Sequence, residues 1–155
     1  MKKALAVAVM SIFLGSVSTS VGAGDFDKQI KARQAVMQLY AFNLGILGSM
    51  AKGAVEYDAD QASIAADNLS ALASMNIGAM WPQGSGITGN EGITWAKDEN
   101  WTEYPKAAEK GKAFKDAAAN MASEAGNGLD ALRGAMGPLG GSCKGCHDAF
   151  RAPKG

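Results

Sequence analysis

The residues best suited to chemistry lie near the C-terminus, where Cys143, Cys146 and His147 form a C-x-x-C-H pattern. On a helix these three positions share one face. Two thiols at that spacing can each add to a vinyl group of one porphyrin, and the next residue's imidazole then lies under the iron. The pattern therefore predicts one haem c per chain, attached through both cysteines, with His147 as the metal ligand.

Two other interpretations of this motif are weaker. A redox disulfide of the thioredoxin type needs a strand–helix context that the sequence does not show. A closed zinc site needs four ligands, whereas the chain holds two cysteines and one histidine. The same counts exclude a disulfide-stabilised scaffold.

Composition narrows the remaining classes of protein. The 155 residues include 15 basic and 15 acidic side chains, so no basic excess points to nucleic-acid binding. With 47% hydrophobic residues, the chain is too apolar for a disordered acidic segment. Aromatic residues make up only 7%, and an alanine- and glycine-rich core leaves room for a flat cofactor.

The first residues have the pattern of a secretory signal peptide. Lys2 and Lys3 precede an apolar stretch at 4–14, and Val21-Gly22-Ala23 fits a small-residue cleavage site. The stretch is too short for a membrane anchor, which needs about 20 residues. We expect a signal peptide at 1–23, one domain at 24–155, a periplasmic location and no membrane attachment after cleavage.

The spacing of apolar residues predicts four helices, at about 25–51, 59–78, 104–125 and 129–151. Asp25, Asp58 and Thr102 are candidate N-caps, and Pro138 is expected to kink or split the fourth helix. A long glycine-containing loop, 81–100, separates the two pairs. The prediction is an all-α antiparallel four-helix bundle, with haem attached near the C-terminal end of the fourth helix. The first helix has a heptad-like seam of Phe26, Ile30, Arg33, Met37, Tyr40, Leu44 and Leu47.

Over nearly the whole segment 24–155 the sequence resembles cytochrome c′, the class II c-type cytochromes. The resemblance is carried by residues 143–151, by Arg33-Gln34 and by the loop from Trp81 to Glu91. The haem motif lies near the C-terminus, whereas ordinary class I cytochromes c carry theirs near the N-terminus.

Arg33 lies on an apolar seam, so it either extends its charge to the end of the bundle or is buried beside an anion. The resemblance favours the second interpretation, with a haem propionate as the anion and Gln34 beside it. Thr88 and Glu91 match loop positions that approach the haem edge in the family. Arg151 either suits the negative end of the helix dipole or, as the resemblance implies, lies beside the proximal histidine.

Met37 follows Arg33 by one helical turn, and the resemblance places it over the open haem face. As a packing residue it leaves the iron five-coordinate, and as a thioether ligand it makes the iron six-coordinate, as in low-spin class II relatives. Packing is favoured, because methionine fills gaps more often than it binds metal.

These features predict a protein that carries electrons, binds nitric oxide and carbon monoxide, or does both. The resemblance implies a homodimer formed through the first two helices. A low-spin His/Met electron carrier is the first alternative. A haem peroxidase or nitric oxide reductase is the second, disfavoured because peroxide cleavage needs a distal acid–base group and the single histidine is assigned to iron.

Overall fold

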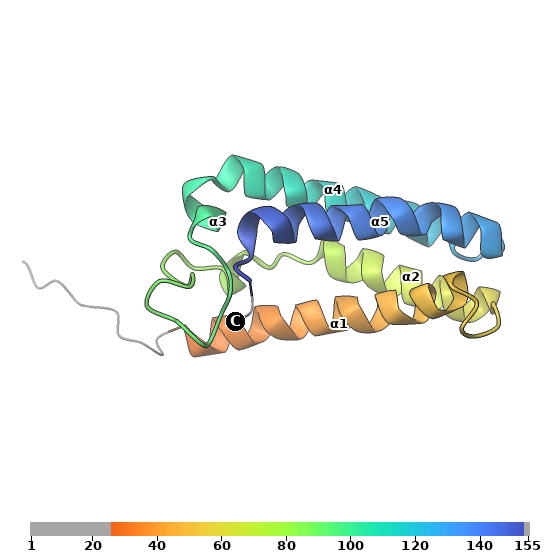
Figure 1. Cartoon of the computed structure of the whole chain (residues 1–155), viewed down its shortest axis with the longest axis horizontal. Coiled ribbons are helices and arrows are strands. Elements are labelled where there is room, and N and C mark those ends of the chain that lie inside the picture. The colour runs from red at the N-terminus through yellow and green to blue at the C-terminus, as the bar shows by residue number, and fades with distance from the viewer. Residues whose placement is uncertain (1–25, 154–155) are drawn as a thin grey trace, which may run out of the picture.

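The computed structural model describes residues 26–153, which form an antiparallel bundle of four long helices (Figure 1). These are α1 (Asp27–Ala51), α2 (Ala59–Ser74), α4 (Tyr104–Glu124) and α5 (Leu129–Phe150). The all-α prediction is confirmed. The expected signal peptide and the Asp25 cap lie outside the described residues.

The connection between α2 and α4 contains two short helices that the sequence pattern did not predict. They are η1 (Gly78–Met80) and α3 (Glu99–Thr102). Asp58 caps α2 as expected, since its carboxylate accepts a hydrogen bond from the Gln61 amide at 2.9 Å. Thr102 does not cap α4, because it is the last residue of α3 and Glu103 occupies the cap position.

Two helix boundaries differ from the prediction for physical reasons. α2 ends at Ser74 instead of near 78, because Met75 adopts an extended conformation with ψ of 143°. α5 is not split at Pro138. Pro138 and Gly134, whose carbonyl loses its helical donor, are both exposed, so water can replace the missing hydrogen bond.

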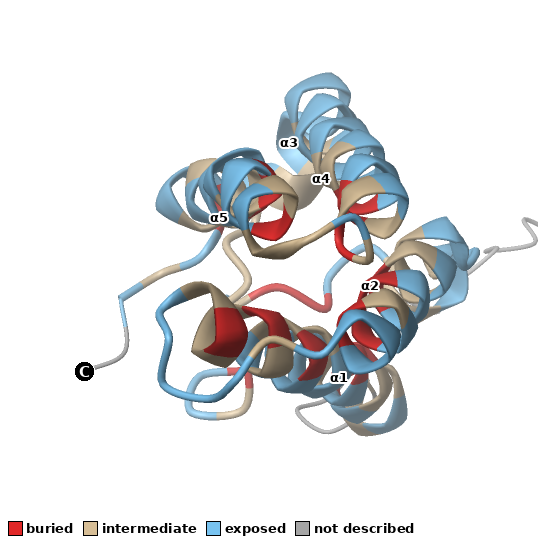
Figure 2. Cartoon of the chain, turned by 90° about the vertical axis from the view of Figure 1, so that its right-hand side faces the viewer, coloured by how far each residue is buried: buried red, intermediate tan, exposed pale blue. Residues whose placement is uncertain are grey.

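The apolar core occupies the half of the bundle that contains the α1–α2 and α4–α5 connections, which we call the closed end. Figure 2 shows the buried segments of the helices facing one another across the interior. Half of the core side chains are alanine, so the helices approach closely there. The buried cluster consists of Leu47, Met50, Ala62, Ala65, Ala66, Leu69, Ala118, Met121, Ala125, Leu132, Ala135 and Leu139.

Hydrogen bonds join the two connections at the closed end. The Tyr57 hydroxyl donates to the Ala125 carbonyl at 2.8 Å and accepts from the Gly128 amide at 3.0 Å. Arg133 Nε donates to the Ala51 carbonyl at 2.8 Å, so α5 completes the C-terminal end of α1. These contacts tie both helix pairs together.

The opposite half, which we call the site end, contains the start of α1, the end of α5 and the long connection that folds across them (Figure 1). Polar residues are buried here, including Arg33, Ser85, Asn90 and Thr94. None of the helices within 26–153 is long and apolar enough to cross a membrane.

Candidate haem site

The two cysteines and the histidine lie in the last two turns of α5, at the site end. Both cysteines are free thiols and both are half-buried, as is His147. Burial raises the pKa of each thiol, so both are held in the neutral form. Two unpaired thiols and one imidazole are thus available together on one helix, as the motif predicts.

The register of α1 against α5 shows what lies opposite the histidine. Arg133 bonds the carbonyl of Ala51, and the Met136 methyl would lie 3.7 Å from a Cβ at Gly48. The helices are antiparallel, so three residues back along α1 correspond to three residues forward along α5. If the same register continues to the site end, Met37 lies at the level of His147.

Tyr40 and Cys143 confirm this register nearer the site. Burial is the main reason that the pKa of Tyr40 is raised, and an electrostatic interaction with Cys143 raises it further. The two side chains are therefore near enough to interact electrostatically across the interior. The α1 seam around Tyr40 and Met37 faces the cysteine-bearing face of α5.

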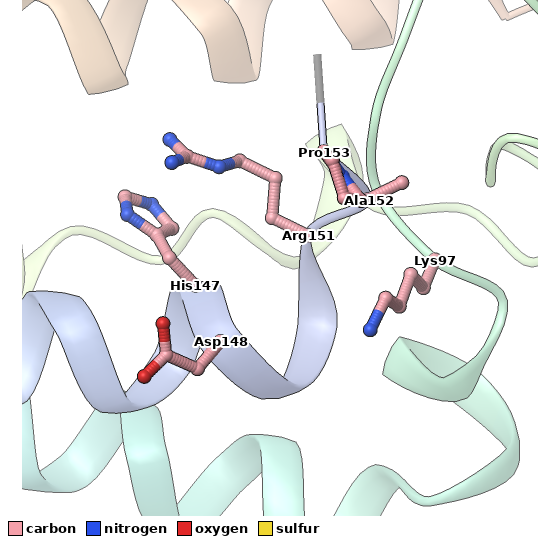
Figure 3. A pocket seen from close by; sticks show the side chains of 6 residues that line it. All are labelled: Lys97, His147, Asp148, Arg151, Ala152 and Pro153. Atoms are coloured by element: carbon pink, nitrogen blue, oxygen red, sulfur yellow. The ribbon is translucent and has the colours of Figure 1, made fainter. Parts of the chain in front are cut away.

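His147 and Arg151 line an open cavity of about 480 Å³ at the end of α5. Figure 3 shows both side chains projecting to the same side, towards α1, while Asp148 points away from them. Burial lowers the pKa of His147 and the Arg151 charge lowers it further, against an opposing effect of Asp148. The imidazole is thus kept neutral, the form that binds a metal.

Arg33 is buried, with 3% of its surface exposed, and donates to the connection between α2 and α4. Its Nη1 bonds Ser85 Oγ at 2.6 Å, and its Nη2 bonds the Ser85 carbonyl at 2.5 Å and Thr94 Oγ1 at 3.0 Å. The guanidinium also lies 4.5 Å from the centre of the Trp81 ring. It therefore does not extend to solvent at the end of the bundle.

Gln34 holds the same connection at a second point, since its Nε2 donates to the Ile93 carbonyl at 2.7 Å. The sequence predicts Arg33 and Gln34 at the site but does not indicate Ser85, Thr94 or Trp101. The Trp101 indole donates to the Trp81 carbonyl at 3.0 Å. The loop has no periodicity that could have identified these partners.

Thr88 and Glu91 are exposed and make contacts inside their own loop. The Thr88 hydroxyl donates to the Asp98 carboxylate. Glu91 accepts from the Gly89 amide at 3.0 Å, and this hydrogen bond lowers the pKa of its carboxyl group. Their approach to a haem edge stays a prediction.

The donors at the site end fit an anionic group. Burial lowers the pKa of Arg33 to about 10, and its hydrogen-bond partners within residues 26–153 are all neutral. Beside it, Trp81 Nε1 is buried with no partner among the described residues. A buried cation and an unsatisfied donor are both stabilised by an acceptor such as a carboxylate, and haem carries two propionates.

The family model described as Cytochrome C' matches residues 28–151. The chain belongs to the cytochrome c′ family. It is 40% identical over 129 residues to cytochrome c-554 of Cereibacter sphaeroides, a match that covers 83% of this chain and 96% of the relative. It is 32% identical over 146 residues to a cytochrome c′ of Cereibacter sphaeroides, covering 94% and 97%.

Solved structures agree with the sequence comparisons. The structure of a cytochrome c′ from Rhodobacter is 34% identical in sequence, with a TM-score of 0.81. The match covers 84% of this chain and 100% of the other. Membership of the cytochrome c′ family confirms the predicted cofactor, haem c bound covalently through Cys143 and Cys146. The four-helix bundle, with the attachment site near the end of the fourth long helix, is likewise confirmed.

Proposed function

We propose that this cytochrome c′ family member is a periplasmic protein with five-coordinate, high-spin iron that binds nitric oxide and carbon monoxide and exchanges electrons. The observation that carries the proposal is the register of α1 against α5. From that register we expect Met37, an apolar residue, to lie at the level of His147, which is the single histidine of the chain. When bound, haem c supplies an iron that changes between ferric and ferrous states and binds diatomic ligands.

The side chains around that position have separate roles. His147 is the iron ligand, kept neutral by burial and by Arg151 on its proximal side. Arg33, with Trp81 and Gln34 beside it, holds a propionate. Thr88 and Glu91 lie at the haem edge, on the exposed side of the loop.

The distal side favours small uncharged ligands over water and anions. Met37 on α1 offers no hydrogen-bond donor to stabilise a bound anion, and the Tyr40 hydroxyl on the same seam already donates to the Leu72 carbonyl at 3.1 Å. A cytochrome c′ variant of Alcaligenes xylosoxidans, 32% identical with a TM-score of 0.72, has been solved as a nitric oxide complex. The same ligand class fits this pocket.

Optical and resonance Raman spectra of both oxidation states test the coordination of the iron. The expected ferrous protein is high-spin and shifts its spectrum when carbon monoxide is added. Low-spin ferrous iron before any ligand is added would overturn the proposal and make Met37 the sixth ligand. In that case Met37→Leu would convert the iron to high spin.

Met37 also supports the second candidate, a His/Met electron carrier. Its side chain is 38% exposed, so tight packing does not hold its thioether away from the site.

The relatives are named as cytochromes, and we propose no enzymatic activity. Sustained peroxide turnover at the rate of a dedicated peroxidase would contradict this.

A homodimer through α1 and α2 fits the exposed apolar residues of those helices. Phe42 is 67% exposed and Ile64 is 61% exposed. Phe42 is next to Asn43 on α1, and Ile64 is one turn before Asn68 on α2. The Asn68 amide donates to the Asn43 side-chain carbonyl at 3.2 Å and so joins the two helices. A related cytochrome c′ shows ligand-controlled dimer dissociation.

Sedimentation of Phe42→Asp and Ile64→Asp tests the dimer, and monomers are expected from both variants. Val55→Asp is the control, because Val55 is 51% exposed but lies in the turn after α1. Monomeric wild-type protein would refute the dimer.

The proposed location predicts that the mature chain begins at residue 24, which mass spectrometry of the periplasmic fraction measures.

A further inference from the structure

The last turn of α5 lacks a closing motif of its own. A helix leaves its final four carbonyl groups without intrahelical donors, and many helices satisfy them with a glycine in the left-handed region. The residue that follows α5 is Arg151, which is extended, with φ of −119° and ψ of 127°. The last carbonyls therefore need donors from another part of the chain.

Residues 95–100 supply those donors. The Lys97 amide donates to the Phe150 carbonyl at 3.0 Å, and Lys97 Nζ donates to the Ala149 carbonyl at 3.1 Å. Asn100 Nδ2 donates to the Phe150 carbonyl at 3.0 Å and to the Lys97 carbonyl at 2.8 Å. One amide group thus joins the segment to the helix end.

Backbone pairing continues beyond the helix. Ala96 and Arg151 form an antiparallel bridge, and the Ala152 amide donates to the Trp95 carbonyl at 2.8 Å. The chain on both sides of Arg151 is therefore held by the same segment. Figure 3 shows Lys97 beside Ala152 and Pro153, across the cavity from His147.

The other end of this segment is bound to α1. Thr94 Oγ1 accepts from Arg33 at 3.0 Å and from the Ala96 amide at 3.2 Å. α5 packs mainly against α4 and much less against α1. The segment is therefore a direct hydrogen-bonded link from α1 to the last turn of α5 at the site end.

We propose that residues 94–100 form a clamp that sets the position of the last turn of α5 relative to α1, with Asn100 as a positioning residue for His147. His147 lies three residues before Phe150, in the turn that Asn100 holds. The proposal rests on the proposed function in taking His147 as the iron ligand. Asn100 touches neither iron nor porphyrin in this role and acts through the helix end.

Hydrogen exchange of the haem-loaded protein tests the clamp, with Asn100→Asp as the variant. Aspartate has nearly the same shape but loses both donated hydrogen bonds. Exchange at 147–152 is expected to accelerate about tenfold or more, the scale of one to two neutral hydrogen bonds. The matched control is Asn127→Asp, which loses a 2.8 Å amide–carbonyl hydrogen bond to Ser123 at the closed end. Equal exchange at 147–152 in the two variants would overturn the clamp.

A spectroscopic readout separates positioning from simple stabilisation. Asn100→Asp is expected to shift or broaden the ferrous iron–imidazole stretching band, whereas Asn127→Asp leaves it unchanged. Asn100→Gln keeps a donor amide and is expected to recover part of the band. Faster exchange with an unchanged band would refute the role of Asn100 in positioning His147.

The result that would refute the clamp differs from the result that would refute the proposed function. If the wild-type ferrous iron is six-coordinate, the five-coordinate proposal is wrong, but the clamp still predicts a high-spin fraction in Asn100→Asp and none in Asn127→Asp. If the wild-type iron is five-coordinate and Asn100→Asp matches it in exchange and in spectrum, the clamp alone is wrong.

Discussion

The closed end and the site end of the bundle are stabilised by different forces. At the closed end, Leu47, Leu69 and Leu132 are fully buried, and the helices meet through apolar contacts. At the site end, Ile30 and Phe150 are also buried, but the buried residues include a guanidinium, a hydroxyl and an amide, and hydrogen bonds join α1 to a long connection. The same four helices thus provide an apolar core at one end and a buried polar network at the other.

This difference indicates a division between stability and cofactor binding. Apolar burial is non-directional and tolerates exchange of similar side chains. A polar network is stable only when every donor is paired, and Trp81 Nε1, beside the Arg33 charge, is a donor that an anionic group would pair. We expect changes at the closed end to alter stability, and changes at the site end to alter the haem.

The largest effect is expected from removal of both thiols. Cys143→Ala with Cys146→Ala leaves no thioether, so all haem should separate from the chain under denaturing conditions. In-gel haem staining and mass spectrometry measure this, with Lys144→Ala as the control between the two cysteines. Haem retained by the double variant would show that attachment lies elsewhere.

A cavity at the closed end is expected to be the next largest change. Leu132 is 0% exposed, and Leu132→Ala should reduce the free energy of unfolding by about 2–5 kcal/mol. Urea unfolding measures the loss, and Val55→Ala in an exposed turn should change it by about 0.5 kcal/mol at most. The ferrous spectrum should not change, and a shifted spectrum would contradict the division between the two ends.

Replacement of Arg33 should lower the free energy of unfolding and change the conformation of the loop between α2 and α4. Arg33→Gln removes charge-assisted hydrogen bonds to Ser85 and Thr94, and we expect a loss of about 2–4 kcal/mol. Fluorescence of Trp81 and Trp101, which flank the guanidinium, should report the opened loop. Arg33→Lys keeps the charge but not the forked geometry, so wild-type stability in that variant would show that charge alone matters.

The smallest effect is expected at Thr88, on the exposed side of the same loop. Thr88→Val removes one hydroxyl–carboxylate hydrogen bond to Asp98, and a loss of about 1 kcal/mol or less should follow. The spectrum of the haem should respond only if Thr88 contacts the haem edge. Comparison of Thr88→Val with Thr88→Ser, which keeps the hydroxyl, decides that point.

Much of the fold and the centre of the site could be predicted from local sequence. Helical periodicity located the four long helices, and the C-x-x-C-H spacing identified the cofactor. Each of these signals comes from residues that lie close together in the sequence. The partners of Arg33 and the contacts of Asn100 could not be predicted. They join residues about 50 positions apart, and only the folded path of an aperiodic loop brings them together.

Tyr57 at the closed end indicates an order of folding. Its hydroxyl bonds to Ala125 and Gly128, which follow it by 68 and 71 positions in the chain. The pairs α1–α2 and α4–α5 form between helices that are nearer in sequence. Formation of this contact docks one hairpin on the other, the slow step expected for distant contacts. We expect Tyr57→Phe to slow refolding more than it speeds unfolding, which stopped-flow measurements would show. The reverse result would mean that the hairpins dock before this contact forms, and that the closed end is completed last.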